Sequence, residues 1–394
     1  IERDAEPMAA IGEERNPVFP GAQSVDEARV ARRVLVTVID GNDKHREEMV
    51  RALGSFYRVR TFAGNDGALP ELLAMPPACI LVDESAGPDG GGAMLRRLRS
   101  AEPLADVPVI ATSNTPASDF MRDAVLCGAR LTGAKPVMRS TLIKAVSGIL
   151  NATVESRWTE LPTVQRQTLQ RTVDVFNNVS DVIEQEAAVP FEGVRESCTP
   201  LVEAVQNNTF RDILNGVRGH DNYSYVHSLR VATFLSLFGT TIGLEGDDLM
   251  VLSTGGLMHD VGKVGIPHAV LNKPGRLDER EFALMKSHVT RSGAILRRSP
   301  GVPRGAVLLA EQHHEKLDGT GYPSGLKGRE INDLARMAAI VDIFGALTDR
   351  RVYKDPMSPE ESLDLMVQMG GTIDQTLLRL FREMLLDACR EAAV

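Results

Sequence analysis

The chain has 394 residues, of which 43% are hydrophobic and 25% charged, and its formal net charge at pH 7 is -9. This charge argues against a protein that binds nucleic acid polymers, because such proteins need a basic surface, although a small nucleotide remains a suitable ligand. No apolar run is long enough for membrane insertion, and the four cysteines are scattered without a C-x-x-C pair, so we expect a cytoplasmic protein with free thiols.

The first part of the chain changes character near residue 33. Residues 1–32 are rich in Ala, Glu, Gly and Pro and lack a sustained period, which predicts a flexible leader. Three runs typical of buried parallel strands then alternate with helical stretches; the runs are 34–39, 79–82 and 107–111. This alternation predicts an α/β domain over 33–150, built on a doubly wound parallel sheet with its site at the carboxyl ends of the strands.

Residues 139 to about 187 look helical almost throughout, and we expect a helical linker over 151–199. Apolar residues recur every three or four positions and form one stripe: Leu169, Val173, Phe176, Val179 and Ile183. Such a helix between two domains either packs on its own domain or pairs with a second copy in a homodimer. The sequence leaves both alternatives open.

The C-terminal part shows no convincing strand pattern. From residue 191 onward, helical segments are separated by turns rich in Gly and Pro. We therefore expect an all-α domain over 200–394, joined to the α/β domain by the long linker helix.

Five of the eight histidines lie near helix ends or Gly-rich turns of this all-α domain, together with two carboxylates. They are His227, His259, His288, His313, His314, Asp260 and Asp342. A single buried His or Asp is most often an ordinary hydrogen-bonded residue. The joint set supplies the ligands that Fe, Mn, Ni or Zn prefer. The two oxygen atoms of Asp260 could also bridge two ions.

Several blocks of the chain resemble one known family. Residues 259–267 resemble the signature of the HD superfamily of phosphohydrolases, and residues 313–323 match the HHExxDGxGYP motif of its HD-GYP branch. Further agreement lies in the blocks 272–275, 285–288, 325–328 and 346–354. The resemblance covers roughly residues 200–370.

The resemblance implies a metal-dependent enzyme that hydrolyses cyclic di-GMP to pGpG, with onward cleavage to GMP left open. It implies two divalent ions, one held by His227, His259, Asp260 and Asp342 and the other by Asp260, His288, His313 and His314. Such a pair of ions can activate water and neutralise a phosphodiester. Asp260 and Lys263 are the residues to which we assign catalytic roles.

Three more residues are candidates for substrate binding besides Lys263. Lys263 follows His259 by four residues, one helical turn, which predicts that both face the same site, and the resemblance assigns it to the scissile phosphate. The resemblance also implies that Arg351 and Lys354 grip the phosphates and that Tyr322 shapes the pocket. Basic residues at a helix end can instead merely complement the helix dipole.

Two positions depart from the members of the family that bind three ions. Those members carry Glu four residues before the first ligand histidine, where this chain has Tyr223, and Asp three residues after Asp342, where it has Gly345. A third cation would need these carboxylates. We therefore predict two ions per chain.

Residues 33–150 resemble, less closely, the receiver domain of response regulators. Asp83 matches the phosphorylated Asp, while Asp40, Ser113 and Lys135 match the supporting residues; Gly41 replaces a second acidic residue, which weakens any Mg²⁺ site. One interpretation is a receiver phosphorylated by a sensor histidine kinase or a small phosphodonor, which would regulate the enzyme through the linker helix. The other is a degenerate receiver that serves dimerisation or another input.

Two further functions compete with cyclic di-GMP hydrolysis. The same metal chemistry could act on another cyclic dinucleotide. A non-catalytic scaffold or nucleotide-binding response regulator is the other alternative, but such members usually lose ligands of the His-Asp or His-His pairs, and this chain retains all of them.

Overall fold

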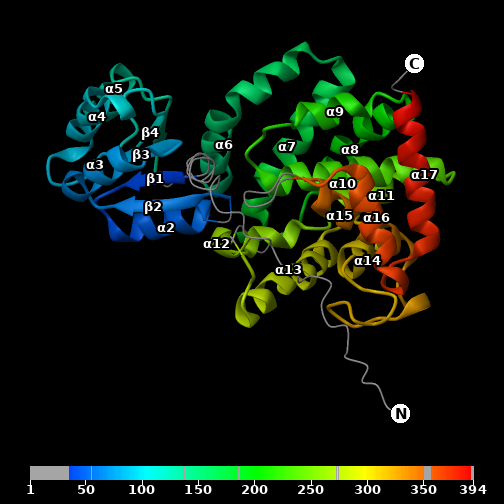
Figure 1. Cartoon of the computed structure of the whole chain (residues 1–394). Coiled ribbons are helices and arrows are strands. Elements are labelled where there is room, and N and C mark those ends of the chain that lie inside the picture. The colour runs from blue at the N-terminus through cyan, green and yellow to red at the C-terminus, as the bar shows by residue number, and fades with distance from the viewer. Residues whose placement is uncertain are drawn as a thin grey trace.

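The computed structural model describes residues 35–54, 56–135, 138–184, 187–271, 273, 275–349 and 356–391. The predicted leader at 1–32 and the two predicted phosphate-binding residues Arg351 and Lys354 lie outside these ranges. The N-terminal part alternates strands and helices, and the named elements among the described residues after 134 are all helices (Figure 1).

A five-stranded parallel sheet forms the N-terminal domain. Its strands are β1 (Leu35–Ile39), β2 (Arg58–Phe62), β3 (Cys79–Asp83), β4 (Val109–Ser113) and β5 (Leu131–Ala134). Their order is β2-β1-β3-β4-β5, and every neighbouring pair is parallel. The predicted doubly wound sheet is confirmed. The sequence revealed β1, β3 and β4, which are buried throughout, but missed β2 and β5, whose residues are partly exposed.

Helices cover both faces of the sheet. On one face lie α2 (Asp43–Leu53) and α6 (Arg139–Ser156), and on the other α3 (Asn65–Ala74), α4 (Gly90–Ser100) and α5 (Asp119–Leu126). Because all strands run in one direction, Asp40 just beyond β1 and Asp83 at the end of β3 share the carboxyl edge of the sheet.

The expected single linker helix is two helices. α6 ends at Ser156, a 3₁₀ turn follows at Arg157–Glu160, and α7 runs over Thr163–Glu184. Pro162 immediately precedes α7, and a proline there ends one helix and starts the next because its ring cannot continue the hydrogen-bonded ladder.

The apolar stripe of α7 packs within its own chain. Leu169, Val173, Phe176 and Val179 are buried in one core together with residues of α8 (Phe191–Gln206). This packing bears on the choice between the two alternatives, because the buried stripe offers no free surface to a second copy. The structure therefore favours the first alternative, and homodimerisation stays a prediction.

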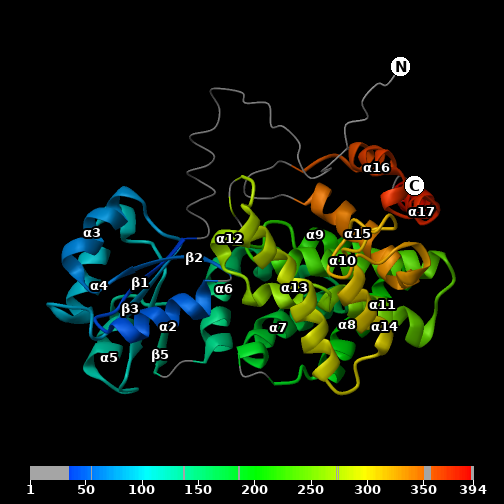
Figure 2. The same ribbon diagram turned by 90° about the horizontal axis from the view of Figure 1, so that it is seen from below.

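The remaining helices form the C-terminal domain (Figures 1 and 2). They are α9 (Phe210–Gly216), α10 (Tyr223–Thr241), α11 (Gly246–Met258), α12 (His268–Leu271), α13 (Glu279–Arg298), α14 (Arg304–Gln312), α15 (Asp333–Thr348), α16 (Pro359–Gln368) and α17 (Gln375–Glu391). α10 and α11 approach closely because Gly256 has no side chain: a Cβ there would lie 2.9 Å from Cα of Ala232.

The two domains touch beside the turn that follows α11. Phe56, between α2 and β2, packs against the core of the sheet domain and that of the helical domain. Arg139, at the start of α6, donates to the carbonyl oxygens of Ala52 (3.1 Å) and Val264 (3.5 Å). None of the described helices has the length and apolar character needed to cross a membrane.

We predict that Leu169→Ala lowers the free energy of unfolding by about 2–5 kcal/mol, because it removes a fully buried side chain from a packed core. Urea denaturation followed by circular dichroism measures this loss. Val125→Ala, at a position that is 61% exposed, is the control and should change stability little. A loss no greater than that of the control would contradict the packing of α7 in its own chain.

Candidate metal centre

The His-Asp pair sits where α11 ends. His259 is the C-terminal cap of α11, and Asp260 leads into a 3₁₀ turn over Val261–Gly265. Gly262 in this turn lets α13 pass at close range, since a Cβ there would lie 2.2 Å from the carbonyl oxygen of His288. The turn and α13 therefore meet with Asp260 and His288 on facing sides.

The structure brings all seven predicted ligands together in two groups. His227 comes from α10 and Asp342 from α15, and with His259 and Asp260 they place ligand atoms within 4.8 Å of one another. His288, His313 and His314, from α13 and the end of α14, form the second group under the same limit. Adjacent residues within a helix point about 100° apart. His313 and His314 can both contribute to the second group because α14 ends at Gln312, just before them.

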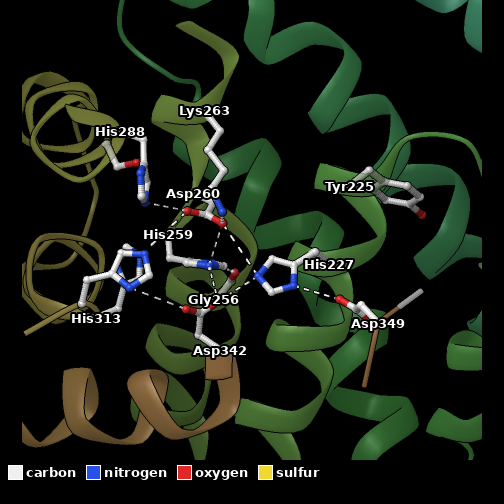
Figure 3. A network of polar contacts seen from close by, with 12 residues as sticks. Tyr225, His227, Gly256, His259, Asp260, Lys263, His288, His313, Asp342 and Asp349 are labelled. Carbon is white, nitrogen blue, oxygen red and sulfur yellow. Dashed lines mark hydrogen bonds and ion pairs between the residues drawn. The ribbon is translucent and has the colours of Figure 1, made fainter. Parts of the chain in front are cut away.

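Asp260 lies between the two groups (Figure 3). Its Oδ1 is 3.1 Å from Nε2 of His288 and 3.8 Å from Nε2 of His313. Its Oδ2 is 3.2 Å from Nε2 of His259 and 3.8 Å from Nε2 of His227. One carboxylate thus presents one oxygen atom to each group, which is the arrangement that a bridging ligand needs.

Three of the histidines are oriented in the same way by their own helices. Nδ1 of His259, His288 and His313 lies 2.7, 2.6 and 2.9 Å from the carbonyl oxygen three residues earlier. A carbonyl oxygen only accepts, so Nδ1 must carry the proton. The Nε2 atom of each ring faces the centre and is the atom that would bind a metal ion once it carries no proton.

The buried polar atoms of the centre fit a metal ion. Nε2 of His259, His288 and His313 and Oδ1 of Asp260 have no hydrogen-bond partner among the described residues. Leaving such atoms unpaired costs free energy, and native proteins rarely do so. Four lone-pair atoms converging from different helices are explained if divalent cations bind there.

The histidine pKa values shift in opposite directions in the two groups. Burial raises the pKa of Asp260, but the charges of His259 and Lys263 outweigh it and hold this pKa well below its ordinary value. Burial lowers the pKa of His259, but the nearby carboxylates outweigh it and raise this pKa to about 10. In the second group burial dominates and lowers the pKa of His314 to about 3. His314 is therefore neutral at pH 7, whereas the first group carries protons that a cation must displace.

Lys263 reaches the centre by a different route from the expected one. The α-helix does not continue to residue 263, so the argument from four-residue spacing fails. The 3₁₀ turn instead folds Lys263 back, and its ammonium group contacts Asp260 three residues earlier. The predicted proximity to the site is found, but the ion pair with Asp260 is its physical cause.

Tyr322 lies beside the second group, with its ring centroid 4.8 Å from that of His314. Phe282 of α13 stands 6.4 Å from Tyr322, and Lys286 lies over both rings. Phe282 is 46% exposed, so this aromatic surface is open to a ligand. Neither Phe282 nor Lys286 was predicted as a site residue. The signal in the sequence was the aromatic side chain of Phe282, six residues before His288.

Glu315 holds the Gly-rich loop in place and was also missed. Its buried carboxylate accepts hydrogen bonds from the backbone N–H groups of Ser324 (2.7 Å) and Leu326 (3.0 Å). The loop between Glu315 and Ser324 carries Tyr322. Glu315 therefore positions the Gly-rich loop rather than binding metal.

The two positions that depart from the family both flank His227. The ring of Tyr223 stacks on that of His227 at a centroid distance of 5.8 Å. A Cβ at Gly345 would lie 3.4 Å from Cε1 of the same imidazole. Neither position supplies a carboxylate to the first group, and the number of ions stays a prediction.

The receiver-like edge of the sheet forms a separate polar cluster. The ammonium group of Lys135 lies 2.5 Å from Asp40 and 2.7 Å from Asp83, and Ser85 and Thr112 donate to Asp83. Burial raises the pKa of Asp83, but these partners outweigh it and lower this pKa below its ordinary value.

Ser113 does not contact Asp83 directly. Its hydroxyl donates to the carboxylate of Glu84. Gly41 is tightly enclosed, because a Cβ there would lie 2.1 Å from the carbonyl oxygen of Ser85. Of the predicted receiver residues, Asp40, Asp83 and Lys135 meet, while Ser113 faces Glu84.

Comparison with known proteins identifies the helical domain. Residues 215–377 match the family model described as HD domain, which confirms the resemblance to the HD superfamily. A cyclic di-GMP phosphodiesterase of Pseudomonas aeruginosa is 35% identical over 161 residues, 41% of this chain and 39% of the relative. The 3'3'-cGAMP-specific phosphodiesterase 2 of Vibrio cholerae is 37% identical over 174 residues, 44% of this chain and 33% of the relative.

A longer match extends into the sheet domain. The cyclic di-GMP phosphodiesterase response regulator RpfG of Xanthomonas campestris pv. campestris is 27% identical over 280 residues, 71% of this chain and 67% of the relative. The chain spans only 39% and 33% of the length of the first two relatives. These similarities support the arrangement of a sheet domain followed by an HD domain.

We predict that chelator-treated protein takes up two divalent ions per chain, and that uptake releases protons because His259, with its pKa raised to about 10, must lose its proton to bind. Elemental analysis after gel filtration gives the number of ions, and pH measurement in weak buffer gives the protons. The first group should bind more tightly as the pH rises. Three tightly bound ions, or none, would contradict the prediction.

Proposed function

We propose that this protein, in which residues 215–377 form an HD domain, is a phosphodiesterase that hydrolyses cyclic di-GMP to pGpG with divalent transition-metal ions. The observation that carries the proposal is the convergence of five imidazoles and two carboxylates on one buried centre. Fe, Mn, Ni and Zn all suit this mixture of nitrogen and oxygen ligands. Onward cleavage of pGpG to GMP would use the same groups.

The proposed catalysis divides the work between the ions and the chain. When bound, the ions would activate water for attack on phosphorus and neutralise the charge of the phosphodiester. Asp260 links the two ligand groups, and its contact with Lys263 keeps an ammonium group at the edge of the centre. Lys263 would bind a phosphate oxygen there, so that negative charge developing on the phosphoryl oxygen atoms meets a fixed positive charge.

The open aromatic surface beside the second group suits a nucleobase. Tyr322 and the exposed Phe282 can stack against a purine, and Lys286 lies within reach of its polar edge. Arg351 and Lys354, outside the described residues, are proposed to hold the phosphates farther from the centre. These roles follow from the chemistry of each side chain and from the resemblance.

A second candidate substrate is 3'3'-cGAMP, because one of the relatives is specific for that dinucleotide. The metal centre would treat both phosphodiesters alike, so the choice depends on base recognition. A non-catalytic scaffold is less well supported, since the chain retains every ligand of the centre.

We also propose that the sheet domain regulates hydrolysis through phosphorylation of Asp83 by a sensor histidine kinase or a small phosphodonor, in a cytoplasmic protein. The domain contact offers a direct route, because Arg139 bonds to Val264, next to Lys263. Burial of the α7 stripe in the helical core favours this contact over relay along a free linker helix. Mg²⁺ for phosphorylation would have Asp40 and Asp83 as ligands.

We predict that metal-loaded protein converts cyclic di-GMP to pGpG and that His259→Ala lowers kcat/KM by about 1,000-fold, equivalent to about 4 kcal/mol. Lys263→Met should lower it by about 100-fold, because a phosphate partner is lost. Chromatography of the products measures both, with 3'3'-cGAMP assayed in parallel.

Lys144→Met is the matched control for the loss of a lysine charge, since Lys144 is on α6 and its side chain is 40% exposed. It should retain full turnover. Hydrolysis that survives His259→Ala would remove the centre from the mechanism, and faster cleavage of 3'3'-cGAMP would replace the proposed substrate.

We predict that a small phosphodonor such as acetyl phosphate, given with Mg²⁺, changes the turnover of the wild type but not that of Asp83→Asn. The substitution keeps the size of the side chain and removes the phosphorylation site. Phosphate-affinity electrophoresis reports the modification, and the hydrolysis assay reports its effect. Identical behaviour of the two proteins would refute the phosphorylation switch.

A further inference from the structure

His227 is held differently from the other buried ligand histidines. His259, His288 and His313 each donate from Nδ1 to a carbonyl oxygen of their own helix. Nδ1 of His227 instead lies 3.0 Å from a carboxylate oxygen of Asp349. Asp349 is the C-terminal cap of α15 and is only 6% exposed. The partner of His227 is therefore a buried carboxylate, whereas the partner of each of the other three histidines is a neutral carbonyl group.

The contact determines which nitrogen atom of His227 can bind a cation. A carboxylate that lacks a proton only accepts, so Nδ1 carries the proton. Nε2 then faces the centre, 2.8 Å from Oδ1 of Asp342 and 3.8 Å from Oδ2 of Asp260. A carboxylate behind the ring also makes the imidazole more electron-rich, and this strengthens its bond to a metal ion.

A third residue fixes Asp349. Nε of Arg230, one helical turn after His227 on α10, lies 2.7 Å from the second carboxylate oxygen of Asp349. Its guanidinium also donates to the hydroxyl of Thr348 at 3.0 Å. The carboxylate is therefore held between an imidazole and a guanidinium, so it cannot easily rotate away from His227.

The position of Asp349 is significant because the two residues beside the imidazole of His227, Tyr223 and Gly345, carry no carboxylate. Tyr223 stacks on one face of His227, and Gly345 borders its Cε1 edge. Neither supplies negative charge to the first group. Asp349 provides that charge at Nδ1, behind the ring, and is not among the groups whose ligand atoms lie within 4.8 Å of one another.

We propose that Asp349 is a positioning residue for the metal centre: it fixes His227 and strengthens the binding of the ion held by His227, His259, Asp260 and Asp342. The second ion, held by His288, His313 and His314, does not depend on it. This inference rests on the metal centre of the proposed function but not on the identity of the substrate.

The test measures the affinities of both ions without nucleotide. Chelator-treated full-length protein is titrated with Co²⁺ in competition with a chromogenic chelator, and the visible absorption of bound Co²⁺ is followed. Asp349→Ala removes both the hydrogen bond and the charge, and should weaken one of the two ions by about 10–100-fold while leaving the other unchanged. Asp349→Asn keeps an acceptor oxygen and should show a smaller loss at the same ion.

Asp364→Ala is the matched control, because this carboxylate on α16 pairs with Arg382 and its side chain is 63% exposed. It should bind both ions like the wild type. Equal affinities in Asp349→Ala and the control would overturn the proposal, as would equal weakening of both ions. If Asp349→Ala does not fold, unchanged binding in Asp349→Asn overturns the proposal and selective weakening supports it.

The titration separates this inference from the proposed hydrolysis. Selective loss of one ion would support the role of Asp349 even if cyclic di-GMP were not a substrate. Wild-type protein that binds no Co²⁺ and no other divalent ion would overturn both proposals.

Discussion

The burial of Asp260 between two groups of histidines is the constraint on which the centre depends. A carboxylate that is almost removed from water is costly unless positive charge surrounds it. Here that charge comes from His259 and Lys263, and its two oxygen atoms face different groups. The end of α11, the 3₁₀ turn and the glycine that admits α13 are the local features that allow this placement. Bound cations would add to the positive charge that the neighbouring side chains place around Asp260.

The sequence predicted which side chains gather at the centre, and the structure brings all seven together. Five of them lie in short local motifs, whereas His227 and Asp342 do not. The sequence predicted less well where contacts join distant segments. The approach of Asp349 to His227 spans 122 residues, and the ion pair of Arg230 with Asp349 depends on the packing of α10 against α15. Arg351 and Lys354 remain predictions. The prediction of a single linker helix missed the break between α6 and α7, although Pro162 lies at that point of the chain.

The sheet domain and the centre are connected by few residues. Phe56 contributes to both cores, and Arg139 bonds to the backbone of the turn that carries Lys263. Lys135 joins Asp40 and Asp83 at the carboxyl edge of the sheet. It lies four residues before Arg139 in the chain. This proximity gives the proposed regulation a physical route, because a shift of the start of α6 would act on the turn beside Asp260.

Anomalous X-ray diffraction from crystals of the metal-loaded protein tests the central claim most directly. Two anomalous peaks per chain are expected, one beside His227, His259 and Asp342 and the other beside His288, His313 and His314, with an oxygen atom of Asp260 bound to each. A single peak, or ions that do not touch Asp260, would contradict the account.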